Sequence, residues 1–137
     1  MPTKYTVRKR PASDGKPALR YSALEVADEP HWGVLSAIDT RARGKIRWQT
    51  RTKEILVAGV VATSGGFLFM GQVSGEYSAF DSASGEQLWS FNCGAGVNAP
   101  PITYALAGTQ HVTVTAGGHN QFVFPRVEAM ITSALPK

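Results

Sequence analysis

The chain carries Ser36-Ala-Ile-Asp-Thr-Arg-Ala-Arg-Gly-Lys-Ile-Arg-Trp48 and, about 42 residues later, a second copy, Ser78-Ala-Phe-Asp-Ser-Ala-Ser-Gly-Glu-Gln-Leu-Trp89. The first copy has one extra residue in its turn. Four strands of five to six residues with short loops need roughly 40 residues, so the offset fits one four-stranded antiparallel sheet. The repeat therefore predicts consecutive sheets of a repeating architecture; the alternative is a generic β-hairpin with a core tryptophan.

Three residue types recur at matching positions of the two copies: Asp39 and Asp81, Gly44 and Gly85, and Trp48 and Trp89. Each aspartate ends a strand, where its carboxylate can accept backbone N–H bonds from the turn, and each glycine supplies a positive φ. Each indole falls in the outgoing strand, where a large ring can fill the gap between twisted sheets. We expect removal of either ring to lower the free energy of unfolding by about 3–5 kcal/mol if it is fully buried.

From residue 33 onward, short apolar or β-branched runs alternate with turn-forming residues, which is typical of an antiparallel meander. Strands are expected at 33–39, 45–51, 59–63, 67–72, 76–81, 87–91, 102–105 and 110–116. No segment predicts a helix. The expected organisation is a basic, poorly structured N-terminal segment (1–32) with possible short strands at 5–7 and 23–26, a repeat region (33–120) and a C-terminal tail (121–137).

The composition, charge distribution and cysteine count of the chain argue against several classes of function. The 137 residues are 43% hydrophobic with a net charge of +4, which fits a globular chain. The basic residues gather before residue 21, in a polar segment that contains prolines, and between 41 and 53, around a turn, so we expect a solvated surface and no nucleic-acid partner. No run is long enough to span a membrane, and no apolar signal-peptide core follows the basic start. Cys93 is the only cysteine, which excludes an intrachain disulfide and a thiolate zinc site.

The repeated unit Ala-x-Asp-x-x-(Thr/Ser)-Gly-x-x-x-Trp resembles the tryptophan-docking motif of the eight-bladed quinoprotein dehydrogenases, in which each tryptophan packs between adjacent blades. The second copy matches in full, at Ala79, Asp81, Ser84, Gly85 and Trp89. The first copy matches with its one-residue insertion, at Ala37, Asp39, Gly44 and Trp48. Segments 58–71, 94–104 and 110–118 are also similar to consecutive parts of that family, so the resemblance covers about residues 33 to 120.

This resemblance implies an all-β fold made of about two four-stranded antiparallel blades of an incomplete quinoprotein-type β-propeller. The family binds pyrroloquinoline quinone and a calcium or lanthanide ion and oxidises an alcohol or a sugar. Its catalytic aspartate and metal ligands belong to earlier blades, and no segment here matches them, so no catalytic or metal residue is assigned. The chain is thus expected to be a C-terminal fragment of such a dehydrogenase, inactive alone, and periplasmic by resemblance.

One wall of the cofactor pocket is the part of the site that the resemblance leaves to this chain. The candidates are Ala58, Gly59, Gly117, Gly118 and His119. Missing side chains at the glycines would let backbone N–H groups approach an anionic ligand, although simple turns explain them equally well. His119 stands where the family often has an aromatic residue, but a solvated loop histidine is the alternative. Val57 replaces a tryptophan that lies against the cofactor in the family.

The sequence is compatible with two function classes. In one, the chain completes a dehydrogenase propeller together with the missing N-terminal blades. In the other, it is a non-catalytic propeller-repeat scaffold that binds protein partners, which the loss of tryptophan at Val57 favours. In both cases unpaired strand edges and uncovered apolar faces predict a partner chain, a homo-oligomer or an incomplete gene product.

Overall fold

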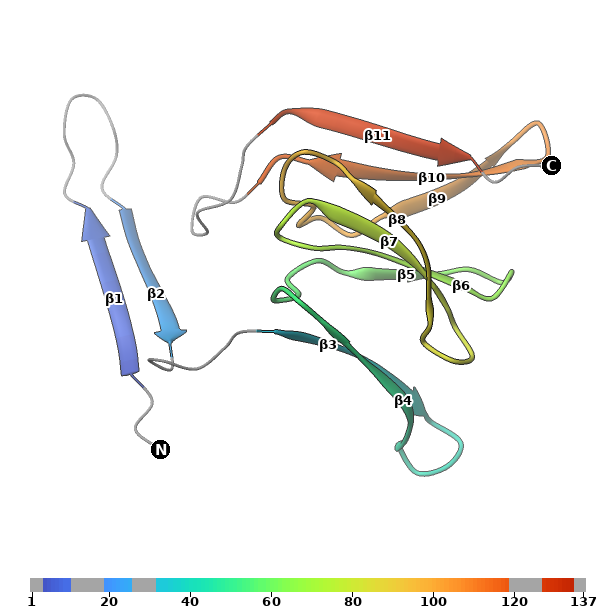
Figure 1. Cartoon of the computed structure of the whole chain (residues 1–137), viewed down its shortest axis with the longest axis horizontal. Coiled ribbons are helices and arrows are strands. Elements are labelled where there is room, and N and C mark those ends of the chain that lie inside the picture. Colours follow the sequence, from blue (N-terminus) through green and yellow to red (C-terminus); the bar gives the residue numbers. More distant parts are fainter. Residues whose placement is uncertain (1–3, 11–18, 26–31, 119–126, 135–137) are drawn as a thin grey trace. The chain divides into compact units, whose positions relative to one another are not determined.

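The computed structural model describes residues 4–10, 19–25, 32–118 and 127–134, and all regular structure in these ranges is β-strand (Figure 1). The described residues include no helix that could cross a membrane. The chain divides into two compact units, Met1–Pro30 and His31–Lys137, which are considered separately.

The first unit holds one antiparallel hairpin. Strand β1 (Lys4–Arg10) pairs with β2 (Leu19–Glu25), in a register that runs from Lys4 opposite Glu25 to Arg10 opposite Leu19. Both strands are seven residues long, so this segment contains more regular structure than the short strands expected at 5–7 and 23–26.

The second unit consists of three antiparallel sheets that follow one another in chain order (Figure 1). The first sheet contains β3 (Gly33–Asp39) and β4 (Lys45–Thr52); the middle sheet contains β5 (Val60–Ala62), β6 (Phe67–Gly71), β7 (Glu76–Asp81) and β8 (Gln87–Asn92); the last sheet contains β9 (Ile102–Leu106), β10 (Thr109–Ala116) and β11 (Ala129–Ala134). Strands β3 to β10 confirm the eight expected strands, with every end within one residue. Strand β11 was not expected.

The incomplete all-β architecture is confirmed, and the structure shows how the strands are distributed. Only the middle sheet has four strands, whereas the first has two and the last has three. The repeat therefore spans both strands of the first sheet, β3 and β4, and the last two strands of the middle sheet, β7 and β8.

Apolar side chains from both faces of the middle sheet hold the three sheets together. On one face Phe69 and Tyr77 form a core with Val112 and Val114 of β10. On the other face Phe80 packs with Met70 of the same sheet and Leu35 of the first sheet. Strand β7 is therefore buried on both sides, from Tyr77 to Phe80.

The first and middle sheets are joined by Trp48, whose ring lies directly on Gly85. A Cβ added at Gly85 would lie 2.7 Å from Cδ2 of this ring, so only glycine leaves room for it. Trp48 Nε1 donates a hydrogen bond of 3.1 Å to the carbonyl of Ser82, and Thr50 Oγ1 donates one of 2.6 Å to the carbonyl of Gly85. The indole of one sheet thus packs on the turn of the next sheet and donates a hydrogen bond to its backbone.

The second tryptophan has different surroundings, and the expectation that both rings are hidden between sheets is wrong for it. Trp89 is 41% exposed. Its ring meets Tyr77 edge-on at 5.4 Å and stacks on Phe91 at 6.2 Å. The counterpart of the Gly85 turn would follow β11, and no strand that the structure describes pairs with the outer edge of β11.

The two aspartates of the repeat accept hydrogen bonds from their own turns. Asp39 Oδ1 accepts the N–H groups of Arg41 and Ala42 at 2.9 and 3.2 Å. Asp81 Oδ1 accepts the N–H of Ser84 at 2.7 Å and its hydroxyl at 2.8 Å. Hydrogen bonds from the Ser84 hydroxyl and from the turn N–H groups lower the pKa of Asp81 below its ordinary value.

Glycine substitution in the two turns should separate backbone strain from contact with Trp48. Gly85 and Gly44 have φ of 76° and 78°, but a Cβ at Gly44 meets nothing within 4 Å. Both Gly→Ala variants should lose stability from the strained φ, and Gly85→Ala should lose about 1–3 kcal/mol more because its methyl group overlaps the indole. Urea unfolding measures the difference, and equal losses would contradict the docking of Trp48.

Lowering the pH should destabilise the chain partly through Asp81. Because the pKa of its carboxyl is lower in the folded than in the unfolded chain, the stabilisation is complete above the unfolded value of about 4. It is lost as the pH falls through the folded value. Asp81→Asn should flatten this acid limb of a plot of urea midpoint against pH, and Ser84→Ala should flatten it in part. An unchanged acid limb in Asp81→Asn would show that this carboxyl contributes nothing to acid unfolding.

Candidate functional site

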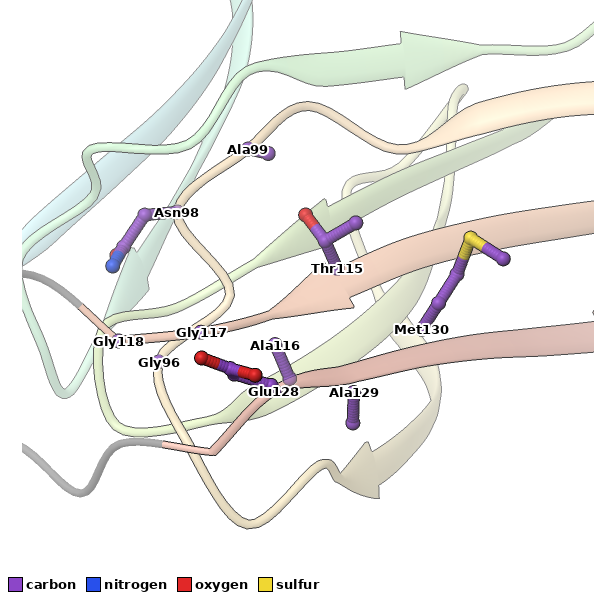
Figure 2. A pocket seen from close by; sticks show the side chains of 10 residues that line it. All are labelled: Gly96, Asn98, Ala99, Thr115, Ala116, Gly117, Gly118, Glu128, Ala129 and Met130. Atoms are coloured by element: carbon purple, nitrogen blue, oxygen red, sulfur yellow. The ribbon is translucent and has the colours of Figure 1, made fainter.

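A hollow of about 640 Å³ opens at one end of the last sheet (Figure 2). It lies between the loop that precedes β9, the end of β10 and the start of β11. Its lining residues are Gly96, Asn98, Ala99, Thr115, Ala116, Gly117, Gly118, Glu128, Ala129 and Met130.

Backbone hydrogen bonds fix the shape of this hollow. The Gly96 carbonyl accepts the N–H groups of both Gly117 and Gly118, at 3.2 and 3.0 Å. A Cβ at Gly96 would lie 2.8 Å from the carbonyl oxygen of Val73, so the loop can approach the middle sheet only with glycine at this position. The neighbouring Val97 is completely buried and anchors the loop in the core.

The most distinctive polar group of the hollow is the amide of Asn98. Its Oδ1 and Nδ2 are both buried, and neither has a hydrogen-bond partner among the residues that the structure describes. An unpaired buried amide is costly, so a change of the Asn98 rotamer that exposed this group to the hollow would let it exchange hydrogen bonds with a bound molecule or with water. Glu128 adds a carboxylate at the start of β11, and the hollow has no lysine or arginine among its described lining residues.

The structure brings together some of the residues expected at the cofactor wall. Gly117 and Gly118 line the hollow, but their N–H groups already donate to Gly96 and are not free for a ligand. Ala58 and Gly59 do not line it, although a Cβ at Gly59 would touch Pro100, next to the lining residue Ala99. His119 lies outside the described residues.

Sequence reasoning missed Asn98 and strand β11. The available signal was a single amide residue in the apolar loop Gly94-Ala-Gly-Val-Asn-Ala-Pro-Pro101, where a polar side chain needs a partner. Val57, at the position of the family's tryptophan, is 43% exposed and is not among the residues that line the hollow.

The hollow fits part of the chemistry of pyrroloquinoline quinone. The Asn98 amide can hydrogen-bond to carbonyl or carboxylate oxygens, and the bare glycines leave room for a planar ring. The carboxylates of the cofactor also require cationic partners, which the described lining residues do not supply. These residues can therefore form one wall of such a pocket. Among the described residues, no three His, Cys, Asp or Glu side chains gather to hold a metal ion.

Comparison with known proteins places these features in one family. Residues 4–112 match the profile of the glucose/ethanol/alcohol dehydrogenase β-propeller domain that is named for pyrroloquinoline quinone. The quinoprotein ethanol dehydrogenase of Pseudomonas putida is 42% identical over 89 residues, which are 65% of this chain. The quinoprotein glucose dehydrogenase of Escherichia coli K12 is 28% identical over 128 residues, which cover 79% of this chain.

Solved structures agree with the sequence matches. The quinohemoprotein alcohol dehydrogenase of Comamonas testosteroni superposes with a TM-score of 0.60 at 32% identity, over 72% of this chain and 14% of that one. A europium-containing methanol dehydrogenase gives a TM-score of 0.63 at 27% identity, over 85% of this chain and 21% of that one. The chain spans only 14% of the length of the P. putida ethanol dehydrogenase. It belongs to the β-propeller family of the quinoprotein glucose, ethanol and alcohol dehydrogenases.

Proposed function

We propose that this chain supplies C-terminal blades of a dehydrogenase that depends on pyrroloquinoline quinone and oxidises an alcohol or a sugar. The observation that carries the proposal is the family match over residues 4–112, combined with a chain that spans about one-seventh of the relatives it matches. The relatives bear the names of ethanol, 1-butanol and glucose dehydrogenases, which is why both substrate classes are retained.

Within the complete propeller, the residues around Asn98, Gly117 and Gly118 form one wall of the cofactor pocket. The quinone, when bound, supplies the electron-accepting chemistry. This chain contributes hydrogen bonds and close packing at the rim, while the catalytic aspartate, the calcium ligands and the cations that balance the cofactor come from blades outside it. The chain alone is inactive. Its compartment is the periplasm, in line with the compartment expected for the family.

A scaffold function remains the second candidate, because two observations favour it. Val57 stands where the resemblance to the family implies a cofactor-facing tryptophan, and the described lining of the hollow contains no cation. A protein-binding propeller module requires the blades and their uncovered faces, but it requires neither a cofactor-facing tryptophan nor a cation in this hollow.

Cofactor binding distinguishes the two functions. Pyrroloquinoline quinone titrated into the purified chain should bind saturably, and Gly118→Val should weaken this binding at least tenfold because it adds a branched side chain at a position that lines the hollow. Gly108→Val is the matched control, since Gly108 has a similar positive φ of 75° but lies in an open turn between β9 and β10. Isothermal titration calorimetry measures both. Equal affinity of the two variants for the cofactor would show that this hollow is not part of the cofactor site.

Activity should depend on the missing blades. With pyrroloquinoline quinone, calcium and an artificial electron acceptor, the chain alone should oxidise neither ethanol nor glucose. Addition of the N-terminal blades of a quinoprotein ethanol dehydrogenase, produced as a separate polypeptide, should restore reduction of the artificial electron acceptor. Turnover by the chain alone would refute the proposal that its catalytic groups lie elsewhere.

A further inference from the structure

A second hollow, of about 350 Å³, is lined by residues from the chain just after β4, from the turn between β6 and β7, and from β8. It therefore joins the first sheet to the middle sheet, and it shares no lining residue with the hollow that contains Asn98. Seven of its eight lining residues are polar, so this inter-sheet hollow is suited to a charged or hydrogen-bonding ligand.

Glu76, at the start of β7, lines the inter-sheet hollow with a carboxylate that is held from one side. Its Oε1 accepts a hydrogen bond of 2.9 Å from Gln87 Nε2 and one of 3.1 Å from the hydroxyl of Ser78, which is completely buried. Its Oε2 has no hydrogen-bond partner among the described residues. Outer hydrogen bonds of this kind orient a carboxylate so that its other oxygen can bind a ligand.

A second carboxylate, that of Glu54, comes from the first sheet. The hydroxyl of Thr52 donates a hydrogen bond of 2.9 Å to the carbonyl of Glu54. A Cβ added at Gly33 would lie 2.8 Å from the same carbonyl oxygen, so the backbone of Glu54 is packed closely against β3. The backbone that carries this carboxylate is therefore fixed relative to the sheet.

The charges that line the inter-sheet hollow do not balance. Glu54 and Glu76 supply two negative charges, and the exposed Lys53 supplies the one positive charge among the lining residues. The one ion pair among the described residues joins Arg47 to Asp39, so neither carboxylate of the hollow is paired with a basic side chain. A bound cation would reduce the repulsion between two like charges that line one hollow.

The buried amide of Gln72 is an independent sign of a ligand. This side chain lines the hollow but is only 3% exposed, and its Oε1 has no hydrogen-bond partner among the described residues. The Gln72 N–H donates to the Glu76 carbonyl at 2.8 Å, which fixes the two residues beside each other. A half-turn of the terminal amide would exchange Oε1 with Nε2 and let the oxygen bind a ligand in the hollow.

We propose that the inter-sheet hollow binds one hard divalent cation, Ca²⁺, through Glu54, Gln72 and Glu76. All three side chains offer oxygen, and no histidine or cysteine lines the hollow, which disfavours zinc and softer metals. Ca²⁺ takes roughly six to eight oxygen ligands in flexible geometry, with water completing the set, whereas Mg²⁺ demands a regular octahedron. Because only two ligands are charged, we expect a Kd of about 0.1–1 mM.

The bound cation joins the first sheet to the middle sheet at a point other than the contact of Trp48 with Gly85. Glu54 belongs to the end of the first sheet, whereas Gln72 and Glu76 flank a turn of the middle sheet. Since the ligands come together only in the folded chain, the cation stabilises the folded state. The inference goes beyond the proposed function and does not depend on binding of pyrroloquinoline quinone.

Isothermal titration calorimetry of Ca²⁺ into the full chain, without pyrroloquinoline quinone, should show one saturable site. Glu54→Gln and Glu76→Gln keep the side-chain shape but remove the charge, so each should weaken binding about fivefold or more. Glu86→Gln is the matched control and should leave the affinity unchanged, because Glu86 is exposed and does not line the hollow. Lys53→Gln should tighten binding about threefold, since it removes a competing positive charge.

Thermal unfolding and hydrogen–deuterium exchange provide two further measurements. At about 10 mM Ca²⁺ the melting temperature of the wild-type chain should rise by about 5–9 °C, and that of a variant with both Glu54→Gln and Glu76→Gln should not change. Exchange of the amides of residues 72–76 should slow on addition of Ca²⁺.

The inference is overturned if the wild-type chain shows no saturable Ca²⁺ binding, or if Glu54→Gln and Glu76→Gln bind as tightly as the wild type. An equal loss in Glu86→Gln would also overturn it, because it would indicate a diffuse response to surface charge. Equal affinity for Mg²⁺ would contradict the choice of Ca²⁺. A misfolded variant cannot imitate the gain expected for Lys53→Gln. Since the cofactor is absent from these titrations, failure of the cofactor proposal and failure of the cation site give different results.

Discussion

The docking of the first sheet on the middle sheet depends on one contact, the ring of Trp48 on the bare backbone of Gly85. The first sheet has only two strands, so its face offers little area for packing, and Leu35 is its one buried apolar side chain. The indole adds a large apolar surface and two hydrogen bonds tie the sheets at the same point, one from Trp48 and one from Thr50. The contact fixes both the spacing and the rotation of one sheet relative to the next.

The strands could be predicted from the sequence, but of the two tryptophans expected to pack between sheets only Trp48 does so. Spacing, turn residues and alternation located β3 to β10 closely, because each of these strands is bounded by local turn chemistry that the sequence displays. Burial of Trp89 is not a local property. It depends on a neighbouring strand that the described part of the chain lacks, so the two copies of the motif end in unequal surroundings.

The candidate site was less predictable for a related reason. Glycines at 117 and 118 signal an unusual backbone, and they do line the hollow, but the sequence does not show which group accepts their N–H bonds. The carbonyl of Gly96, which precedes them by 21 and 22 residues, accepts both. Asn98 was overlooked because it stands out only by its burial without a hydrogen-bond partner. Burial of this kind depends on tertiary packing and cannot be inferred from the residue type. Strand β11 has no repeat partner in the sequence from which to infer it.

The three tryptophans of the chain occupy three distinct electronic environments. Trp48 is shielded and hydrogen-bonded to a carbonyl, Trp32 lies under the Arg51 guanidinium at 3.7 Å, and Trp89 is partly open to water beside Phe91. Indole emission shifts to shorter wavelength when water is excluded. The chain thus carries an intrinsic optical reporter, in which the red-shifted component from Trp89 records whether the outermost blade is complete.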